Sequence, residues 1–164
     1  MTDDEPSDPP RVVVWVRELA VPPGDPRATV LSRLRELESR GLVADVSVRV
    51  WGTAVDAAVA DGGEYDQPVR SRVAEFYRWA DRTGHSLEPA FRREQRSSML
   101  STERSEVVRL PLVCVAVYAN DDLRGVFPCS AGEEPDTRTV RDCLERFETG
   151  AIGGGANAGI GKRD

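Results

Sequence analysis

The sequence predicts a single-domain mixed α/β fold, built on a four-stranded mixed sheet. Three apolar segments, residues 12–16, 46–50 and 112–118, have the composition and length of strands. Helical patterns lie between these segments and after them, and a chain of 164 residues suits one domain with its own core. The predicted order is strand, helix, strand, helix, strand, strand, helix (βαβαββα), with helices on both faces of the sheet.

The first strand, residues 12–16, is apolar at every position, which indicates that both of its faces are buried. Asp25 is suited to cap a helix that begins at Pro26, since an acceptor side chain before a proline is typical of a helix start. An apolar stripe at helical spacing follows, and Gly41 supplies the left-handed residue that ends the helix. We therefore expect a crossover to a parallel second strand.

The second strand, residues 46–50, alternates between valine and polar residues, so we expect an edge strand with one wetter face. Trp51 continues the polar side of this alternation, so it either packs under a loop or marks a partner surface. Residues 52–66 are rich in glycine and acidic residues and are predicted to be a loop. A second helix is expected from about residue 68 to residue 83, and Gly84 ends it.

The second half of the chain begins with residues 86–109, for which we predict extended structure and a polar loop near residue 97. The apolar strand after Pro111 is expected to form a hairpin with residues 123–127. A last helix is predicted to begin at Asp136. The two most apolar strands should lie at the centre of the sheet, and the other two at its edges.

This element order, with a proline directly before the third core strand, resembles the thioredoxin-like fold over about residues 11–149. In that family the proline is cis, so the resemblance implies a cis bond at Pro111. It also places a redox centre in residues 19–25, where this sequence has no cysteine. Classical dithiol exchange is therefore not expected. The alternative is a ferredoxin-like α+β arrangement, which requires residues 87–95 to pair as a strand.

A second resemblance rests on three segments, residues 12–17, 48–52 and 110–114. They are similar to a family of small haloarchaeal proteins that are labelled helix-turn-helix domain proteins. The label implies a transcription-related role and transfers no functional residue to this chain. A helix-turn-helix needs two helices joined by about 3–4 residues. In this sequence a strand or a long loop separates each predicted helix from the next.

The net charge is −6, and Lys162 is the only lysine among the 22 basic residues. An acidic surface repels nucleic acid. Adaptation to high salt and a GC-rich genome explain the shortage of lysine equally well. Because salt screens the repulsion, the net charge is only a weak argument against DNA binding.

Residues 1–10 are predicted to be a disordered acidic tail and residues 150–164 a flexible glycine-rich tail, on either side of a domain at 11–149. No run of about 18 apolar residues is present, so no membrane partner is expected. The acidic N-terminus is unlike a secretory signal. The three cysteines are an odd number without CxxC spacing, which favours a reducing cytoplasm.

The cysteines are also the candidates for chemistry. Cys114 and Cys143 lie among apolar residues and are expected to pack in the core. Cys129 follows Pro128 at the end of a strand and is the weak candidate for a catalytic thiol. His85 is the only histidine, and with scattered thiols it makes no metal-ligand set, so no metal or other cofactor is predicted.

The candidates for partner contacts lie elsewhere. Arg92, Arg93 and Arg96 belong to the densest basic stretch and are candidates for nucleic-acid phosphates, although nearby glutamates nearly cancel their charge. Trp51 is a candidate partner contact, and the edge strand from Val46 to Val50 is a candidate for self-association. We therefore predict a non-catalytic cytoplasmic regulatory or binding protein whose partner is a protein or DNA. The alternative is a divergent thioredoxin-like one-thiol redox protein that uses Cys129 or Cys143.

Overall fold

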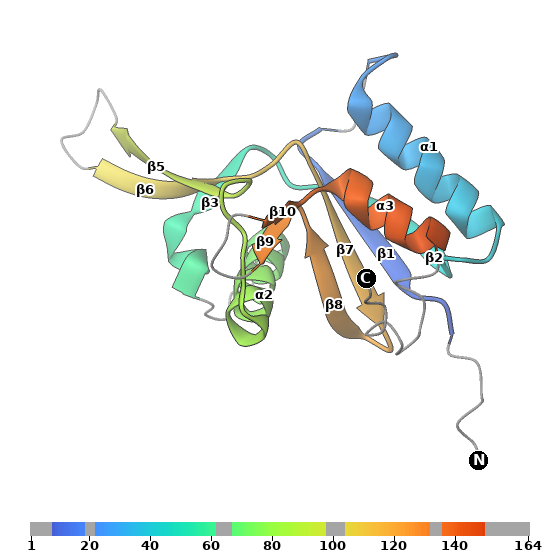
Figure 1. Ribbon diagram of the computed structural model, residues 1–164. Coiled ribbons are helices and arrows are strands. Elements are labelled where there is room, and N and C mark those ends of the chain that lie inside the picture. The colour runs from blue at the N-terminus through green and yellow to red at the C-terminus, as the bar shows by residue number, and fades with distance from the viewer. Residues whose placement is uncertain (1–7, 19–21, 62–66, 98–103, 132–135, 150–164) are drawn as a thin grey trace.

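The computed structural model describes residues 8–18, 22–61, 67–97, 104–131 and 136–149. Its main sheet has four strands in the order β2-β1-β7-β8, and helices cover both faces (Figure 1). The predicted mixed α/β fold with a four-stranded mixed sheet is confirmed. Most of the two predicted tails, residues 1–7 and 150–164, lies outside the described residues.

The main sheet has its most apolar strands at the centre. The strands are β1 (Arg11–Val16), β2 (Asp45–Val50), β7 (Val113–Ala119) and β8 (Asp122–Phe127). β1 pairs in parallel with β2 and antiparallel with β7, which pairs antiparallel with β8. A central strand with two covered faces buries nearly all of its side chains and is therefore apolar. β2 instead alternates apolar and polar residues, and it lies at an edge of the sheet, as the sequence predicts. Asn120 and Asp121 have positive φ in the β7–β8 turn, which such a tight hairpin requires.

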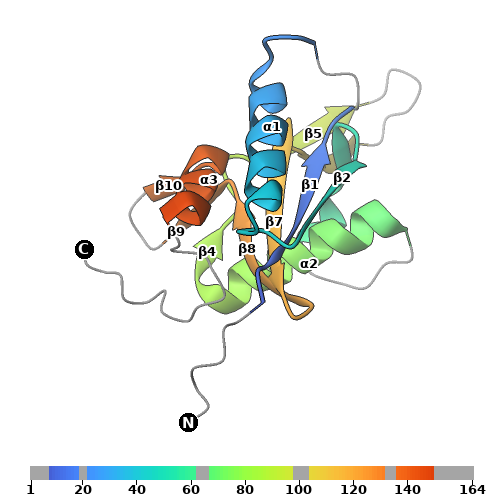
Figure 2. The same cartoon turned by 90° about the vertical axis from the view of Figure 1, so that its right-hand side faces the viewer.

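Two helices, α1 (Pro26–Ser39) and α3 (Val140–Thr149), cover one face of the main sheet (Figures 1 and 2). The side chain of Asp25 caps α1, because it accepts the backbone N–H of Arg27 at 2.8 Å. Gly41 follows the helix with φ 78°, as predicted. The apolar core of this layer joins both helices to alternate positions of β1; it includes Val12, Val14, Val16, Leu34, Leu37, Leu144 and Phe147.

The opposite face is covered by α2 (Pro68–Thr83), which begins and ends where the sequence predicts. Gln67 accepts the backbone N–H of Arg70 at 2.7 Å, and Gly84 ends the helix with φ 76°. The other positions of β1 face this helix. The second core includes Trp15, Trp51, Val73, Phe76, Ala80, Cys114 and Ala116.

Two smaller antiparallel sheets complete the fold. One contains β3 (Ala54–Asp56), β5 (Arg92–Ser97) and β6 (Arg104–Arg109), and the other β4 (His85–Ser86), β9 (Cys129–Ala131) and β10 (Asp136–Arg138). Extended structure predicted within residues 86–109 is observed in β5 and β6, whereas residues 98–103, where the polar loop is predicted, lie outside the described residues. β5 overlaps the strand that the ferredoxin-like alternative requires, but it pairs with β6 outside the main sheet.

Two predicted boundaries are wrong. The predicted loop at residues 52–66 contains β3 and a 3₁₀ helix, η2 (Ala57–Asp61), because β3 pairs with β6 and Val59 is fully buried. The last helix begins at Val140 rather than Asp136, since residues 136–138 pair with β9. A reciprocal cap fixes this start: the Thr139 N–H donates to Asp142 Oδ2 at 2.8 Å, and the Asp142 N–H donates to Thr139 Oγ1 at 3.1 Å.

The sequence leaves the isomer of the Leu110–Pro111 bond open, and the cis bond that the thioredoxin-like resemblance implies at Pro111 is not observed. The cis X–Pro bonds of the described residues are Glu88–Pro89 and Phe127–Pro128. Both backbone groups of Leu110 are hydrogen-bonded. Its N–H donates to the carbonyl of Thr53 at 2.8 Å, and its carbonyl accepts Nε of Arg17 at 2.9 Å. The Leu110–Pro111 bond keeps the trans geometry that is the default of X–Pro bonds.

Candidate functional site

The basic stretch of the sequence forms a projecting hairpin, β5–β6, which we call the arm (residues 92–97 and 104–109). Figure 1 shows the arm extending away from the main sheet. Its two strands carry five arginines and two glutamates, a net charge of +3 in a protein of net charge −6. β6 also pairs with β3, and Val108 is fully buried. The base of the arm, which includes Arg92, Arg93 and Arg109, is thus fixed to the body, and the rest of the two strands extends beyond β3.

The three candidate arginines of the arm do not form one cluster. Side chains alternate along a strand, and residues paired across two strands share a face. Arg92 pairs with Arg109, so these two positions and that of Arg96 lie on one face of the hairpin, whereas Arg93 lies on the other. Of Arg96 only the place in the strand is described. The arm therefore carries positive charge on both of its faces.

Glutamates offset these arginines through exposed ion pairs. Glu94 lies 2.8 Å from Arg92 and 3.9 Å from Arg109, and Glu106 lies 4.0 Å from Arg93. The side chains of Arg92 and Arg93 are 65% and 46% exposed. Exposed pairs of this kind contribute between zero and about 1 kcal/mol. The guanidinium groups can therefore exchange these carboxylates for another anion at little cost.

Trp51, the candidate partner contact, belongs to the core. It is 5% exposed, and its ring stacks on Trp15 with 5.5 Å between centroids. Its indole Nε1 donates to the carbonyl of Pro111 at 3.3 Å. The predicted partner surface is wrong at this position because Phe76 of α2 and Phe91 at the base of the arm cover this end of β2. The alternative prediction, packing beneath other structure, is the correct one.

The three cysteines are unpaired and buried. Cys129, the weak catalytic candidate, is 2% exposed, and burial raises the pKa of its thiol to about 11. Burial also raises the pKa values of Cys114 and Cys143. A nucleophilic cysteine needs an accessible thiolate. The buried surroundings of Cys129 and Cys143 oppose the formation of a thiolate. They give no support to the alternative of a one-thiol redox protein.

We expect the native protein to resist alkylation. With a pKa of about 11, only about one part in a thousand of the Cys129 thiol is ionised at pH 8. Iodoacetamide followed by intact mass measurement should show native modification at least about 100-fold slower than in denaturant, where all three cysteines react. Rapid labelling of Cys129 in the folded protein at pH 8 would contradict its buried position.

His85 lies beside a pocket of about 360 Å³ at the end of α2. Its ring stacks on Trp79 at 4.7 Å, and Nδ1 lies 2.8 Å from Oγ1 of Thr83. Burial, followed by the positive charge of Arg138, lowers the pKa of His85. The ring therefore packs against the last turn of α2. In the described ranges, no group of three or more His, Cys, Asp or Glu side chains could hold a metal ion.

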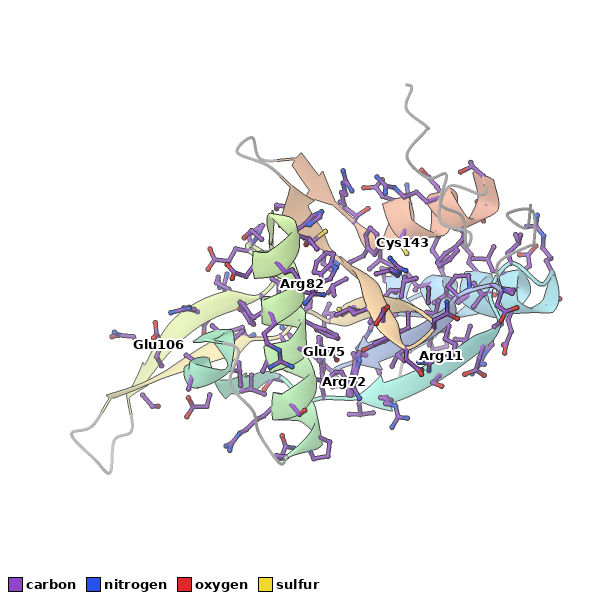
Figure 3. All side chains as sticks on the ribbon, turned by 90° about the horizontal axis from the view of Figure 1, so that it is seen from below. Arg11, Arg72, Glu75, Arg82, Glu106 and Cys143 are labelled. Atoms are coloured by element: carbon purple, nitrogen blue, oxygen red, sulfur yellow. The ribbon has the colours of Figure 1, made fainter. Side chains whose placement is uncertain are left out.

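A second concave region, of about 440 Å³, lies between α2 and the β2 edge of the main sheet. We call it the arginine groove because three guanidinium groups line it, those of Arg11 on β1, Arg49 on β2 and Arg72 on α2. Arg11 and Arg72 are labelled in Figure 3, with Glu75 of α2. The sequence signal for this groove is the polar alternation of β2, which indicates a face that is not covered.

Aromatic and acidic side chains hold part of this groove in place. The Arg11 guanidinium lies 5.3 Å from the centre of the Tyr118 ring and 3.3 Å from Asp121. The Tyr118 hydroxyl donates to Glu75 at 3.4 Å, and Glu75 pairs with Arg72 at 2.7 Å. Burial, followed by the charge of Glu75, raises the pKa of Tyr118 to about 12. The hydroxyl therefore remains protonated and acts as a donor.

The three α-helices of the described ranges are far apart in the chain, although the short 3₁₀ helix η2 precedes α2 without a strand between them. Strands lie between α1 and α2 and between α2 and α3, so no two of these helices are joined by a short turn. None of them is long and apolar enough to cross a bilayer. In the comparison with known families, a model described as a helix-turn-helix domain matches residues 4–152. No curated protein and no solved structure matches the chain.

Proposed function

Since the chain belongs to the helix-turn-helix domain family, we propose that it is a cytoplasmic, transcription-related regulatory protein that binds DNA through its arm. The observation that carries the proposal is a two-stranded ribbon of net charge +3 on an acidic protein, and the outer part of this ribbon projects from the body. The major groove of DNA admits a two-stranded β-ribbon as well as an α-helix. The arm has the shape and the charge for this kind of contact.

The positions of α1 and α3 favour the arm over a recognition helix formed by either of these two. A recognition helix must present a free face to the major groove and follow another helix closely. Leu34 and Leu37 of α1 and Phe147 of α3 are buried against the main sheet. The Arg33–Glu148 ion pair, at 2.8 Å, joins the two helices on their outer side. The two helices therefore form a structural layer rather than a reading surface.

The distribution of charge also favours the arm. A body with excess negative charge is repelled by DNA, so a positive projection is the part that approaches it most closely. Arg92 and Arg93 lie on opposite faces of the hairpin, so each face presents a guanidinium group to a phosphate. Phosphates would replace Glu94 and Glu106 as the partners of these guanidinium groups.

The test is fluorescence anisotropy of a labelled random duplex at several salt concentrations. The wild-type protein should bind, with an affinity that falls as salt rises. The variant Arg92→Ala/Arg93→Ala/Arg96→Ala should bind at least about tenfold more weakly, because each arginine–phosphate pair is a charge-assisted hydrogen bond. The slope of log affinity against log salt should become shallower by about 0.9 for each phosphate that the variant no longer neutralises.

The matched control is Arg33→Ala/Arg35→Ala/Arg40→Ala, which removes the same charge from α1 and the residue that follows it, on the opposite face of the main sheet. This control should keep most of the wild-type affinity. Equal losses in the two variants would mean that net charge alone governs binding, and the arm would not be the contact. Failure of the wild-type protein to bind duplex at low salt would overturn the proposed function itself. Circular dichroism verifies that both variants fold.

A further inference from the structure

The outer edge of β2 is a row of backbone groups beside which the described residues place no other strand. β2 is the first strand in the order β2-β1-β7-β8, so only its inner side is paired, and Figure 2 shows it at the outer side of the main sheet. The N–H of Trp51 donates to the carbonyl of Val16 at 2.9 Å. In a parallel pair with this register, the odd-numbered positions of β2 bond to β1. The N–H and C=O groups of Val46, Val48 and Val50 therefore point outward.

One side chain of α1 contacts this edge. Nη1 of Arg35 donates to the carbonyl of Val46 at 3.3 Å, as expected for a carbonyl that points away from β1. The Arg35 side chain is 57% exposed, and a long, exposed hydrogen bond contributes little, so a backbone N–H from another strand can replace it. Val50 is 42% exposed at the far end of the same edge. An open strand edge is a template for pairing with another chain.

The side chains of β2 are complementary to those of a second, antiparallel copy. Asp45, Ser47 and Arg49 share one face of the strand. When two copies pair about Ser47, each Asp45 opposes the Arg49 of the other copy. Asp45 and Arg49 are exposed, and neither forms an ion pair with the residues that the structure describes. Centring the pair on Val46 or Val48 instead places one of these charges opposite Ser47 and loses both ion pairs.

We propose that the protein forms a homodimer in which the β2 strands of two copies pair antiparallel about Ser47. Val46 and Val48 of one copy exchange backbone hydrogen bonds with Val48 and Val46 of the other. Two Asp45–Arg49 ion pairs fix the register, because every other register loses them. The two copies are related by a two-fold axis, as in most homodimers. The interface uses no arm residue, so it does not depend on the DNA-binding proposal.

Cysteine cross-linking tests the register. Ser47→Cys places two thiols across a non-hydrogen-bonded pair, whose Cα atoms lie about 4.5 Å apart, within reach of a disulfide. Oxidation with copper phenanthroline should convert this variant to a disulfide-linked dimer on a non-reducing gel. Asp45→Cys and Arg49→Cys should not cross-link alone, because each is about 13 Å from its own copy, but a mixture of the two should. The wild type, whose native cysteines are buried, is the background control.

Charge reversal tests the ion pairs by sedimentation equilibrium, at protein concentrations up to about 500 μM because small interfaces are weak. The wild type should show a monomer–dimer equilibrium. Arg49→Asp should weaken it at least about tenfold, since it sets two like-charge pairs across the interface. Asp45→Arg/Arg49→Asp exchanges the charges and should return the affinity to within about threefold of the wild type. Arg141→Asp, on α3 away from β2, makes the same change of net charge and should leave the affinity unchanged.

A wild-type protein that stays monomeric up to that concentration would overturn the proposal. So would equal weakening by Arg49→Asp and Arg141→Asp, or an exchanged variant that fails to recover, since either result would show that Asp45 and Arg49 do not oppose each other. Cross-linking of Arg49→Cys alone as readily as Ser47→Cys would exclude a register centred on Ser47. Dimerisation of a protein that does not bind duplex would support this proposal while rejecting the proposed function.

Discussion

Replacing Trp51 with alanine should lower the free energy of unfolding by about 3–5 kcal/mol, the range observed for a buried aromatic residue changed to alanine. Trp51 is 5% exposed and lies against Trp15, Phe76 and Phe91. Its removal would leave a cavity where the main sheet, α2 and the base of the arm meet. Urea unfolding, followed by circular dichroism, measures the change.

The conservative variant Trp51→Phe refines this prediction. It keeps an aromatic ring in the cluster but removes the hydrogen bond to Pro111, so it should destabilise the protein less than the alanine variant does. Leu112→Ala is the matched surface control, because Leu112 is 50% exposed and should change stability within about 0.5 kcal/mol. A destabilisation below about 1 kcal/mol for Trp51→Ala would show that Trp51 is not in the core.

Phe147→Ala in α3 should also lower the free energy of unfolding by about 3–5 kcal/mol, because it removes a buried aromatic ring from the core on the other face of the main sheet. Phe147 is 2% exposed and packs in the layer formed by α1, α3 and the sheet. The same urea titration measures this change. The exposed Glu145, which lies on α3 close to Phe147 in sequence, serves as the control, and Glu145→Ala should be nearly neutral.

The Phe147 variant also bears on the role of α3. If Phe147→Ala is as stable as the wild type, α3 is not docked on the sheet and its apolar face is free for another use, including DNA recognition. A large destabilisation supports the arrangement in which α1 and α3 form one structural layer. In that arrangement a helix-turn-helix family member would contact DNA through a part of the chain other than these two helices.

Much of the fold could be predicted because it depends on local patterns. Asp25 and Pro26 begin α1, and Gly41 follows its end, because caps and left-handed glycines act within a few residues of themselves. The apolar strands predicted at the sheet centre are β1 and β7, because strands covered on both faces exclude polar side chains. The start of α3 was missed because residues 136–138 pair with β9.

The candidate sites were harder to predict. Local charge density located Arg92 and Arg93, but only the register of β5 on β6 places Arg109 on the same face of the hairpin as Arg92. Side-chain exposure was predicted least well. Trp51 and Arg49 are two residues apart, so the alternation of the strand predicts that both point to the same, more polar face. Phe76 and Phe91 cover the tryptophan, whereas Arg49 stays exposed.

The sequence by itself determined the three α-helices, the four strands of the main sheet and the acidic charge, because each depends mainly on neighbours in the chain. Only the tertiary structure decided which backbone groups of β2 point away from β1, and that the outer part of the arm projects from the body. The physical reason is that burial and hydrogen-bond satisfaction depend on which distant segments meet. For β2 this segment is β1, and no local pattern records the register in which the two strands pair.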